Sequence, residues 1–508
     1  MSRSNRAKVL VVGARPFDEA PFIERGLIPV RVELDQFDDA LLSSARGIML
    51  ADHPGRFGLI NQYFSGPFDR ACEMGLMTAS FSTGAHDGGR VAVARNAAYA
   101  RIGAAPSKYP ILWAVDETVA AISEKLARHD PGPELGKAKI QTAGLKIQAD
   151  PAISKLLQRA FWDCDTITVE PLLGGKTAKG TYRVFASLAG PELGPQPMPF
   201  FVKIGNRQDI EDEKENYRRR AEPFIPFHLR PSLNEARCVS TLTSAALVCN
   251  FVDSAIALRE TLRNGQGAGA IFSLFEVTLR GLRSHVLKSQ AEPGIIETFF
   301  DKKVRVAEIP RARITRARRQ SHCRDPKLLG QILKNLATGI NSRRGIYHGD
   351  LHAGNVMVRQ RDAIVIDFGS MQDFGPITAD PAILEVSLVF GMDDGDGEES
   401  LVAWRGFVSE IFLKTFPLSP PPPSSDHFRF AWLRKAVREI RHVVTCCVKE
   451  DPEALIILCG CLLRFARLSR SDLKNKALRN LSEDRRSYAL VIADRICSRI
   501  EKGEYAKS

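Results

Sequence analysis

The segment GIYHGDLHAGNVMVRQRDAIVIDFGSM, residues 345–371, is the most informative part of this chain. It contains Asp350, then Asn355, then Asp367 followed by Phe-Gly. The apolar runs at 356–358 and 363–368 predict a β-hairpin that brings the three polar side chains to one point. Phosphoryl transfer uses such a set. One carboxylate accepts the proton of a hydroxyl nucleophile, and an amide and a second carboxylate are oxygen ligands for Mg²⁺.

The motif HGDLHAGNVMV, followed by IDFG, resembles the catalytic and metal-binding loops of the aminoglycoside phosphotransferase and choline kinase branch of the protein-kinase-like superfamily. The resemblance implies a two-lobed α+β kinase-like fold over about residues 150–500. It also implies that Asp350 is the catalytic base and that Asn355 and Asp367 are the Mg²⁺ ligands. His348 is expected to be structural, and His352 to orient other groups rather than transfer a proton.

The same resemblance implies a preceding lobe that binds ATP. Residues 166–188 predict a strand, a glycine-bearing turn and a second strand, in which glycines let the backbone approach phosphates. The candidate phosphate-binding residues are Gly174, Gly175, Lys176, Thr177 and Gly180. The turn departs from the GxGxxG pattern of protein kinases, so the sequence leaves open which backbone amides contact the nucleotide.

A lysine–glutamate pair is the next feature that the resemblance implies. Lys203 lies in the apolar run PFFVKIG, and the charged helix expected at 209–222 can offer it a carboxylate. Glu213 is the preferred partner because it shares a helical face with Ile210 and Tyr217, and Glu215 is the alternative.

The hinge and the region after the catalytic motif are the remaining features of the resemblance. Residues 244–262 resemble the kinase hinge, where Asn250 to Val252 are expected to bind adenine. Only about ten residues separate the Asp-Phe-Gly motif from a helix expected at 380–390, which favours a small-molecule acceptor over a peptide. Asp380 is expected either to cap that helix or to be a buried anchor for the catalytic loop.

The first 130 residues lie outside the resemblance. Their short apolar runs alternate with helical patterns, which predicts a small parallel α/β sheet of Rossmann-like or degenerate receiver-like type. Gly13-Ala14-Arg15-Pro16 supplies no dinucleotide fingerprint, and Asp52 lacks the acidic pair of a working phosphoacceptor. A role in docking a protein partner or sensing a signal is therefore favoured. The predicted organisation is this domain at 1–130, a linker at 131–150, an N-lobe and hinge at 151–262, and a helical C-lobe at 263–508.

The composition of the chain limits the classes of protein and partner that are expected. The chain has 508 residues, of which 44% are hydrophobic, and a formal net charge of +12, so a soluble protein with an anionic ligand or partner is expected. The basic segment 302–319 has little aromatic interleaving, which makes a nucleic acid partner unlikely but leaves an anionic acceptor or partner open. Ten scattered cysteines are expected to be reduced core residues, and the lack of a signal peptide or membrane span predicts a cytoplasmic location.

The leading hypothesis is an ATP- and Mg²⁺-dependent phosphotransferase acting on a small-molecule hydroxyl. The alternative is a nucleotide-binding switch or scaffold within a bacterial conflict or signalling assembly. Transfer of AMP rather than phosphate also stays open, and the acceptor is not defined by any motif.

Overall fold

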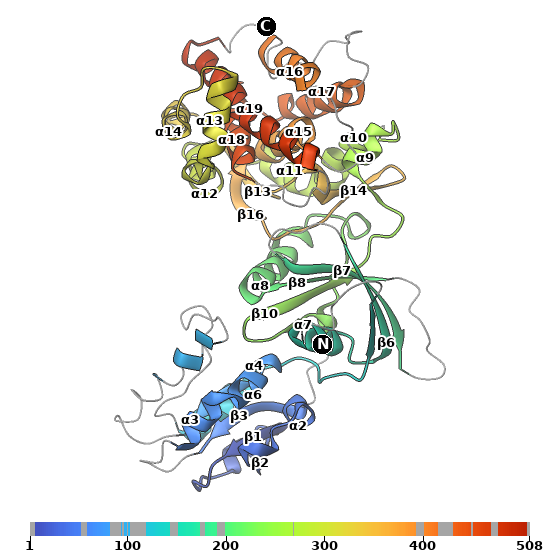
Figure 1. The fold of residues 1–508 in the computed structure, drawn as a ribbon, viewed down its shortest axis with the longest axis vertical. Coiled ribbons are helices and arrows are strands. Elements are labelled where there is room, and N and C mark those ends of the chain that lie inside the picture. Colours follow the sequence, from blue (N-terminus) through green and yellow to red (C-terminus); the bar gives the residue numbers. More distant parts are fainter. Residues whose placement is uncertain are drawn as a thin grey trace. The chain divides into compact units, whose positions relative to one another are not determined.

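The computed structural model divides the chain into two compact units (Figure 1). Unit 1 comprises Met1–Asp212 and Ser232–Asp253, and unit 2 comprises Glu213–Pro231 and Ser254–Ser508. The structure describes residues 6–51, 58–81, 93, 96–98, 100–101, 118–142, 151–172, 178–189, 199–267, 269–392, 401–414, 430–448, 451–468 and 476–504. The domain boundaries expected from the sequence remain predictions.

A four-stranded parallel sheet forms the N-terminal part of unit 1 (Figure 1). The strands, in the order β2-β1-β3-β4, are β2 (Ile28–Val32), β1 (Lys8–Val12), β3 (Ala45–Leu50) and β4 (Met77–Ser80). Leu10 and Val12 face one core and Val9 and Val11 the other. Burial on both faces explains why β1 is a continuous apolar run. Residues 109–115, one of the apolar runs from which the parallel sheet is predicted, lie outside the described residues, as does Asp52. The helices here are α1 (Ala20–Ile23), α2 (Asp39–Ser44), α3 (Gly58–Ser65), α4 (Pro67–Glu73) and α6 (Val119–Arg128).

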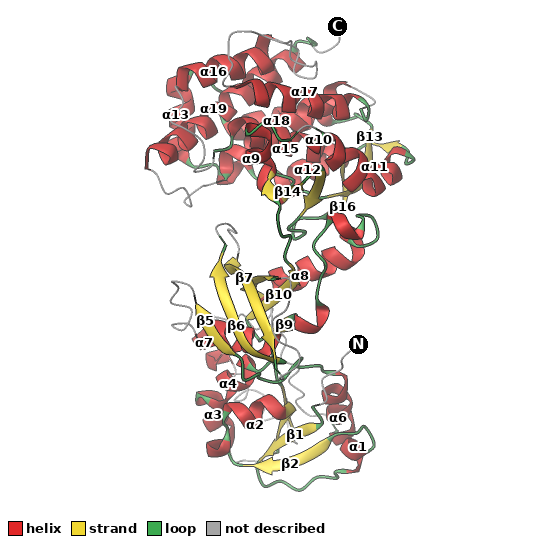
Figure 2. Cartoon of the chain, turned by 90° about the vertical axis from the view of Figure 1, so that its right-hand side faces the viewer, coloured by secondary structure: helices red, strands yellow, loops and turns green. Residues whose placement is uncertain are grey.

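A six-stranded sheet forms the rest of unit 1, in the order β5-β6-β7-β8-β10-β9 (Figure 2). The strands are β5 (Lys139–Thr142), β6 (Cys164–Pro171), β7 (Ala178–Leu188), β8 (Phe200–Asn206), β9 (Val239–Ser240) and β10 (Ser244–Asn250). β5 pairs parallel with β6, and the other pairs are antiparallel. Helix α7 (Pro151–Ala160) buries Leu156 and Leu157 in the same core as Val202 of β8 and Val248 of β10.

Arg159 of α7 connects segments from both parts of unit 1. Its side chain is fully buried and donates hydrogen bonds to the backbone carbonyls of Glu73, Pro131, Pro133 and Ser240. Burial lowers the pKa of this arginine to about 9. Carbonyl oxygens from α4, from the connection after α6 and from β9 therefore converge on a single guanidinium, which is the side chain with most donors.

Unit 2 is mostly helical (Figure 2). Its helices are α9 (Leu258–Arg263), α10 (Ala270–Ser273), α11 (Arg280–Leu287), α12 (Ile295–Lys303), α13 (Arg311–Gln320), α14 (Pro326–Ala337), α15 (Ala379–Phe390), α16 (Leu401–Ser409), α17 (Ala431–Thr445), α18 (Asp451–Arg467) and α19 (Lys476–Glu501). Helix α15 is buried along almost its whole length, and an ion pair of 2.7 Å between Arg441 of α17 and its Glu385 lies in this core. None of the helices that the structure describes is long and apolar enough to span a membrane.

Short strands in unit 2 surround the segment singled out from the sequence. They form the sheets β11-β14-β15 and β12-β13-β16. The strands are β11 (Ile256–Ala257), β12 (Ala291–Glu292), β13 (Ser342–Tyr347), β14 (Val356–Arg359), β15 (Asp362–Val365) and β16 (Gln372–Pro376). The hairpin predicted from the two apolar runs is the β14–β15 pair.

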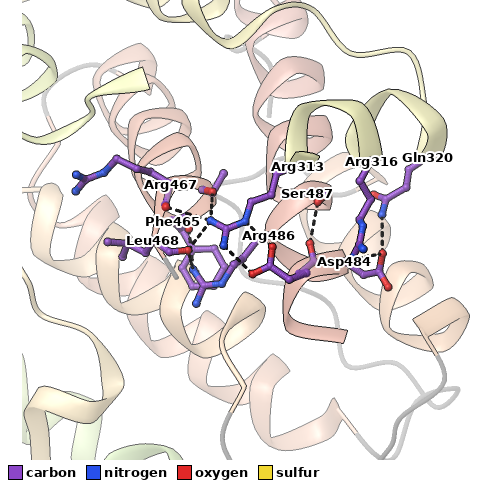
Figure 3. Close-up of polar contacts among 11 residues, drawn as sticks. Arg313, Arg316, Gln320, Phe465, Arg467, Leu468, Asp484, Arg486 and Ser487 are labelled. Atoms are coloured by element: carbon purple, nitrogen blue, oxygen red, sulfur yellow. Dashed lines mark hydrogen bonds and ion pairs between the residues drawn. The ribbon is translucent and has the colours of Figure 1, made fainter. Parts of the chain in front are cut away.

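Two arginines of the basic segment 302–319 are part of the internal packing of unit 2 (Figure 3). Arg313 of α13 donates to the carbonyls of Ala466, Arg467 and Leu468 at the end of α18, and its guanidinium also pairs with Glu483 at 2.6 Å. Arg316 pairs with Asp484 of α19 at 3.5 Å. The charges of these two residues are therefore used to fix helices, not to form an anion-binding surface.

All ten cysteines are free. Eight are buried and Cys238 is half-buried, as expected for reduced core residues. The prediction is wrong for Cys446, which is exposed. Helix α17 ends at Thr445, so Cys446 lies in the following turn and does not continue the buried face of the helix.

Candidate active site

The β14–β15 hairpin sets the spacing of the predicted catalytic residues. Val356 pairs with Val365, and the Ile366 amide donates to the Asn355 carbonyl at 3.0 Å, which extends the ladder by one position. Asp367 follows directly with φ +63°, a left-handed conformation that few residues other than glycine adopt. The end of the hairpin therefore carries Asn355 directly before β14 and Asp367 two residues after β15.

A buried histidine connects this hairpin to Asp350. His348 is fully buried, its Nε2 lies 3.1 Å from the Ile366 carbonyl, and its Nδ1 accepts a hydrogen bond of 3.4 Å from the Asp350 amide. Because Nδ1 accepts from the Asp350 amide, Nε2 is the ring nitrogen that donates to the Ile366 carbonyl. The contacts fit the structural role predicted for His348. Asn355 Nδ2 donates to the Asp350 carbonyl at 2.9 Å, so its Oδ1 is the atom that can bind a metal.

Asp380 anchors the catalytic loop. Its carboxylate, only 6% exposed, accepts hydrogen bonds from the amides of His348 at 2.7 Å and Gly349 at 2.9 Å. Burial raises the pKa of Asp380, against the effect of His348 and of these two hydrogen bonds. Of the two roles expected from the sequence, the structure shows the buried anchor, because Thr378 is the N-cap residue of α15.

Gly349 must be a glycine for the loop to keep this shape. Its φ is +74°, and a Cβ atom there would lie 2.5 Å from the Ser370 carbonyl oxygen. We expect Gly349→Ala to reduce the free energy of unfolding by about 1–3 kcal/mol more than Gly339→Ala does. Gly339 is the matched control because it has φ +86° but nothing within 4 Å of a Cβ. Equal losses in chemical denaturation would show that the contact with Ser370 is unimportant.

Two cations that the sequence did not predict as site residues, Arg464 and Lys303, lie near Asp350. Arg464 Nη2 of α18 binds Asp350 Oδ1 at 2.6 Å, and His352 Nε2 lies 3.9 Å from Oδ2. Burial alone would raise the pKa of Asp350, but the charges of Arg464, His352 and His348 outweigh it and hold the pKa below its ordinary value. The pKa of His352 is lowered, chiefly by burial. With Nδ1 accepting from the Gly354 amide, its protonated nitrogen points towards Asp350, as expected for an orienting residue.

Lys303, at the end of α12, is the second cation. Its Nζ donates to the Ser370 carbonyl at 3.1 Å. Burial and the nearby charge of Arg464 lower its pKa to about 8, while Asp350 and Asp380 act in the opposite direction. At neutral pH the amine is therefore still mostly protonated.

The lowered pKa of Lys303 makes stability depend on pH. Between about 8 and the ordinary value of 10.5, the unfolded chain binds a proton that the folded chain does not. The free energy of unfolding of the natural protein should therefore rise relative to Lys303→Met as the pH increases through this window. Denaturant unfolding of both proteins at about pH 7.5 and about pH 9.5 measures this difference. A difference that does not change with pH would contradict the assignment.

The end of helix α8 (Arg207–Asn216) contacts the Asp-Phe-Gly segment within unit 2. Asn216 Nδ2 donates to the Gly369 carbonyl at 3.1 Å, and the rings of Phe368 and Tyr217 are 5.6 Å apart. Glu213, on the same side of the helix, is 4% exposed. Glu215 instead forms an ion pair with Arg219 four residues along the chain. Burial therefore favours Glu213 over Glu215 as the functional carboxylate.

The predicted nucleotide-binding residues of unit 1 lie in or just after strands of the six-stranded sheet, or outside the described residues. Lys203 is buried in β8, beside Leu247 of β10 and Thr181 of β7. Gly180 lies in β7, and Asn250 and Val252 lie at the end of β10, where the Asn250 amide already donates to Ser232. Gly174, Gly175, Lys176 and Thr177 lie outside the described residues. The pairing of Lys203 with Glu213 remains a prediction because the two residues belong to different units.

The donor atoms at the hairpin suit a magnesium ion. Asn355 Oδ1 and the Asp367 carboxylate are hard oxygen donors, and Mg²⁺ commonly uses one or two carboxylates together with phosphate and water oxygens. Across the described ranges, no cluster of three or more His, Cys, Asp or Glu side chains could hold a metal. Two oxygen donors from the protein fit a magnesium ion whose other ligands are phosphate and water oxygens.

Comparison with known proteins gives one family match and a set of similar structures. A family model described as ternary complex associated domain 9 matches residues 316–489, a range that includes both Asp350 and Arg464. No curated protein matches.

Two aminoglycoside phosphotransferases are among the similar solved structures. One is a thermostable mutant of APH(4)-Ia in its apo form, with 11% identity, 67% of this chain and 95% of that chain covered, and a TM-score of 0.38. The other is APH(3'')-Id from Streptomyces rimosus ATCC10970, with 16% identity, 53% and 92% covered, and a TM-score of 0.27. Further structures of these enzymes hold ADP with hygromycin B or with streptomycin.

Proposed function

We propose that this protein is an ATP- and Mg²⁺-dependent phosphotransferase that moves the γ-phosphate to a hydroxyl group of a small acceptor molecule. One observation carries the proposal. Hydrogen bonds from Asn355 Nδ2 to the Asp350 carbonyl and from the Ile366 amide to the Asn355 carbonyl join Asp350 to Asn355, and Asn355 to the residue directly before Asp367, in one short network. This arrangement supplies a base and two oxygen ligands, the parts that phosphoryl transfer needs.

Each residue of this network has a distinct proposed role. Asp350 orients the acceptor hydroxyl and takes its proton while the acceptor oxygen bonds to the γ-phosphorus. The bond from that phosphorus to the bridging oxygen breaks, and ADP keeps the electron pair. Asn355 and Asp367 would hold Mg²⁺, which when bound neutralises charge on the phosphates. The nucleotide-binding roles of Gly180, Lys203, Glu213, Asn250 and Val252 remain predictions.

The short connection after the Asp-Phe-Gly segment supports a small acceptor. Residues 370–378 link Gly369 to α15, and β16 occupies most of this stretch. Protein kinases use a much longer segment here to bind peptides. The N-terminal sheet of unit 1 is the part that we propose to bind a protein partner, and a cytoplasmic location remains a prediction.

Nucleotide binding tests the metal assignment directly. We expect the non-hydrolysable ATP analogue AMP-PNP to bind in the presence of Mg²⁺ and much more weakly with EDTA. Asp367→Asn should weaken the Mg²⁺-dependent binding by at least about tenfold, since even outer-shell partners of a metal have effects of that size. Asp362→Asn, at the other end of the same hairpin, is the control. Calorimetric titration that gives equal affinities for the natural protein and Asp367→Asn would overturn the assignment.

A nucleotide-dependent switch within a protein assembly is the second candidate. The ion pair from Arg464 occupies Oδ1 of Asp350, which favours a resting state in which the base is blocked. The match to the family described as ternary complex associated domain 9 is also compatible with this candidate. Mg²⁺-dependent AMP-PNP binding without turnover of ATP would support it, and label transferred only from α-labelled ATP would indicate AMP transfer.

A further inference from the structure

Two basic side chains from helices α12 and α18 meet at the proposed catalytic base. Arg464 Nη2 lies 2.6 Å from Asp350 Oδ1, and its side chain is 9% exposed. Lys303 Nζ is fixed by the Ser370 carbonyl and would lie 3.1 Å from a Cβ atom at Gly349, the residue before Asp350. Both cations therefore lie beside the atoms that an acceptor hydroxyl must approach.

Two cations lie beside Asp350 at this position. Arg464 pairs with Asp350 directly, Lys303 is influenced by both Asp350 and Asp380, and the carboxylate of Asp380 already accepts two amide hydrogen bonds. The Nε of Arg464 is also buried and has no hydrogen-bond partner among the described residues. A buried guanidinium with an unused donor beside a second cation favours an anion with several acceptor oxygens.

The backbone that carries Arg464 is firmly held (Figure 3). Arg313 donates to the carbonyls of Ala466, Arg467 and Leu468, and Arg486 donates to those of Phe465 at 2.9 Å and Leu468 at 2.7 Å. These contacts satisfy the carbonyl groups that the end of a helix leaves unpaired. The position of Arg464 is therefore fixed by the fold, and only its side chain needs to move to change partner.

An arginine bound to a catalytic carboxylate opposes proton transfer. Arg464 occupies Oδ1 of Asp350, so that this oxygen cannot accept the proton of an acceptor hydroxyl while the ion pair is in place. Catalysis then requires that Arg464 find another anion when the acceptor arrives. A phosphate or carboxylate group on the acceptor would provide it, and binding of the acceptor would free the base.

We propose that the acceptor is an organic anion that carries its reacting hydroxyl near a phosphate or carboxylate group, and that Arg464 and Lys303 bind this group and release Asp350. This inference rests on the proposed phosphotransferase function. In the complete reaction the acceptor hydroxyl becomes a phosphate ester, ATP becomes ADP, and the hydroxyl proton passes to Asp350 and then to solvent. The same two cations are able to bind the γ-phosphate of ATP, so the test separates the two sources of phosphate.

The first arm of the test measures anion binding without ATP. Inorganic phosphate is titrated into the natural protein, Arg464→Gln, Arg464→Lys and Arg467→Gln, with calorimetry as readout and circular dichroism to confirm folding. Arg467 is the control because it lies on the same helix but pairs with Glu308 at the surface. We expect at least about tenfold weaker binding for Arg464→Gln, partial recovery with Arg464→Lys, and no change for Arg467→Gln. Failure of phosphate to bind the natural protein, or equal binding by Arg464→Gln, overturns the inference.

The second arm compares matched acceptors in the presence of γ-labelled ATP. Glycerol is paired with glycerol 3-phosphate, and ribose with ribose 5-phosphate. We expect the label to reach the phosphorylated member of a pair at least about tenfold faster, and Arg464→Gln to remove that preference without changing the affinity for AMP-PNP. A preference for the neutral member, or a loss of AMP-PNP affinity in Arg464→Gln, would overturn the inference. Absence of any turnover with intact phosphate binding would instead count against the phosphotransferase function and leave the anion site supported.

Discussion

Asp350→Asn should lower the rate of phosphoryl transfer by about 10²–10⁴-fold, the usual contribution of a positioned general base. The amide that replaces the carboxylate cannot accept the hydroxyl proton. The backbone contacts to His348 and Asn355 involve main-chain atoms and should be unaffected. Asp373→Asn is the control, since Asp373 is an exposed acid paired with Arg220. Steady-state kinetics that show less than about a tenfold loss would contradict a role for Asp350 as base.

The ion pair with Arg464 gives this variant a second expected effect. Removing the charge of Asp350 leaves a largely buried guanidinium without its carboxylate, which is destabilising. The double variant Asp350→Asn with Arg464→Gln should therefore recover stability but not activity. Recovery of both would mean that the loss in the single variant came from misfolding. Chemical denaturation and kinetics on the same samples separate the two effects.

Asp380→Ala should reduce the free energy of unfolding by about 2–6 kcal/mol, because two buried amides each lose a partner at about 1–3 kcal/mol. These amides belong to His348 and Gly349, so the loop that carries Asp350 should also lose its shape and its activity. Asp301→Ala is the control, because Asp301 is an acid with 65% of its side chain exposed that pairs with Lys334. Equal unfolding free energies for the two variants, measured by denaturant titration, would show that Asp380 is not the anchor of the loop.

Local sequence patterns account for the parts of this protein that could be predicted. The β14–β15 hairpin follows from two short apolar runs around a polar turn, and its register alone brings Asn355 close to Asp367. The burial of Glu213 follows from helical spacing, because Glu213 shares the buried face of its helix with Ile210. Such features depend on residues that are close to one another in the sequence, so the sequence pattern is enough to predict them.

The cations at the site could not be predicted because their contacts are distant in the sequence. Arg464 is separated from Asp350 by more than a hundred residues, and within an apolar helix it carries no spacing signal. Lys303 looked like one of many charges in a basic segment. In that same segment Arg313 is buried and holds the end of α18. Only the packing of α12, α13 and α18 distinguishes Lys303, which lies at the candidate site, from Arg313, which holds the end of a helix.

The most direct test of the central claim is the fate of labelled ATP. Purified protein with Mg²⁺ and the acceptor pairs is given γ-labelled or α-labelled ATP, alongside Asp350→Asn. The account predicts that label leaves γ-labelled ATP for an acceptor, that none leaves α-labelled ATP except as ADP, and that Asp350→Asn nearly abolishes transfer. Label that moves only from α-labelled ATP, or transfer that Asp350→Asn leaves unchanged, would contradict it.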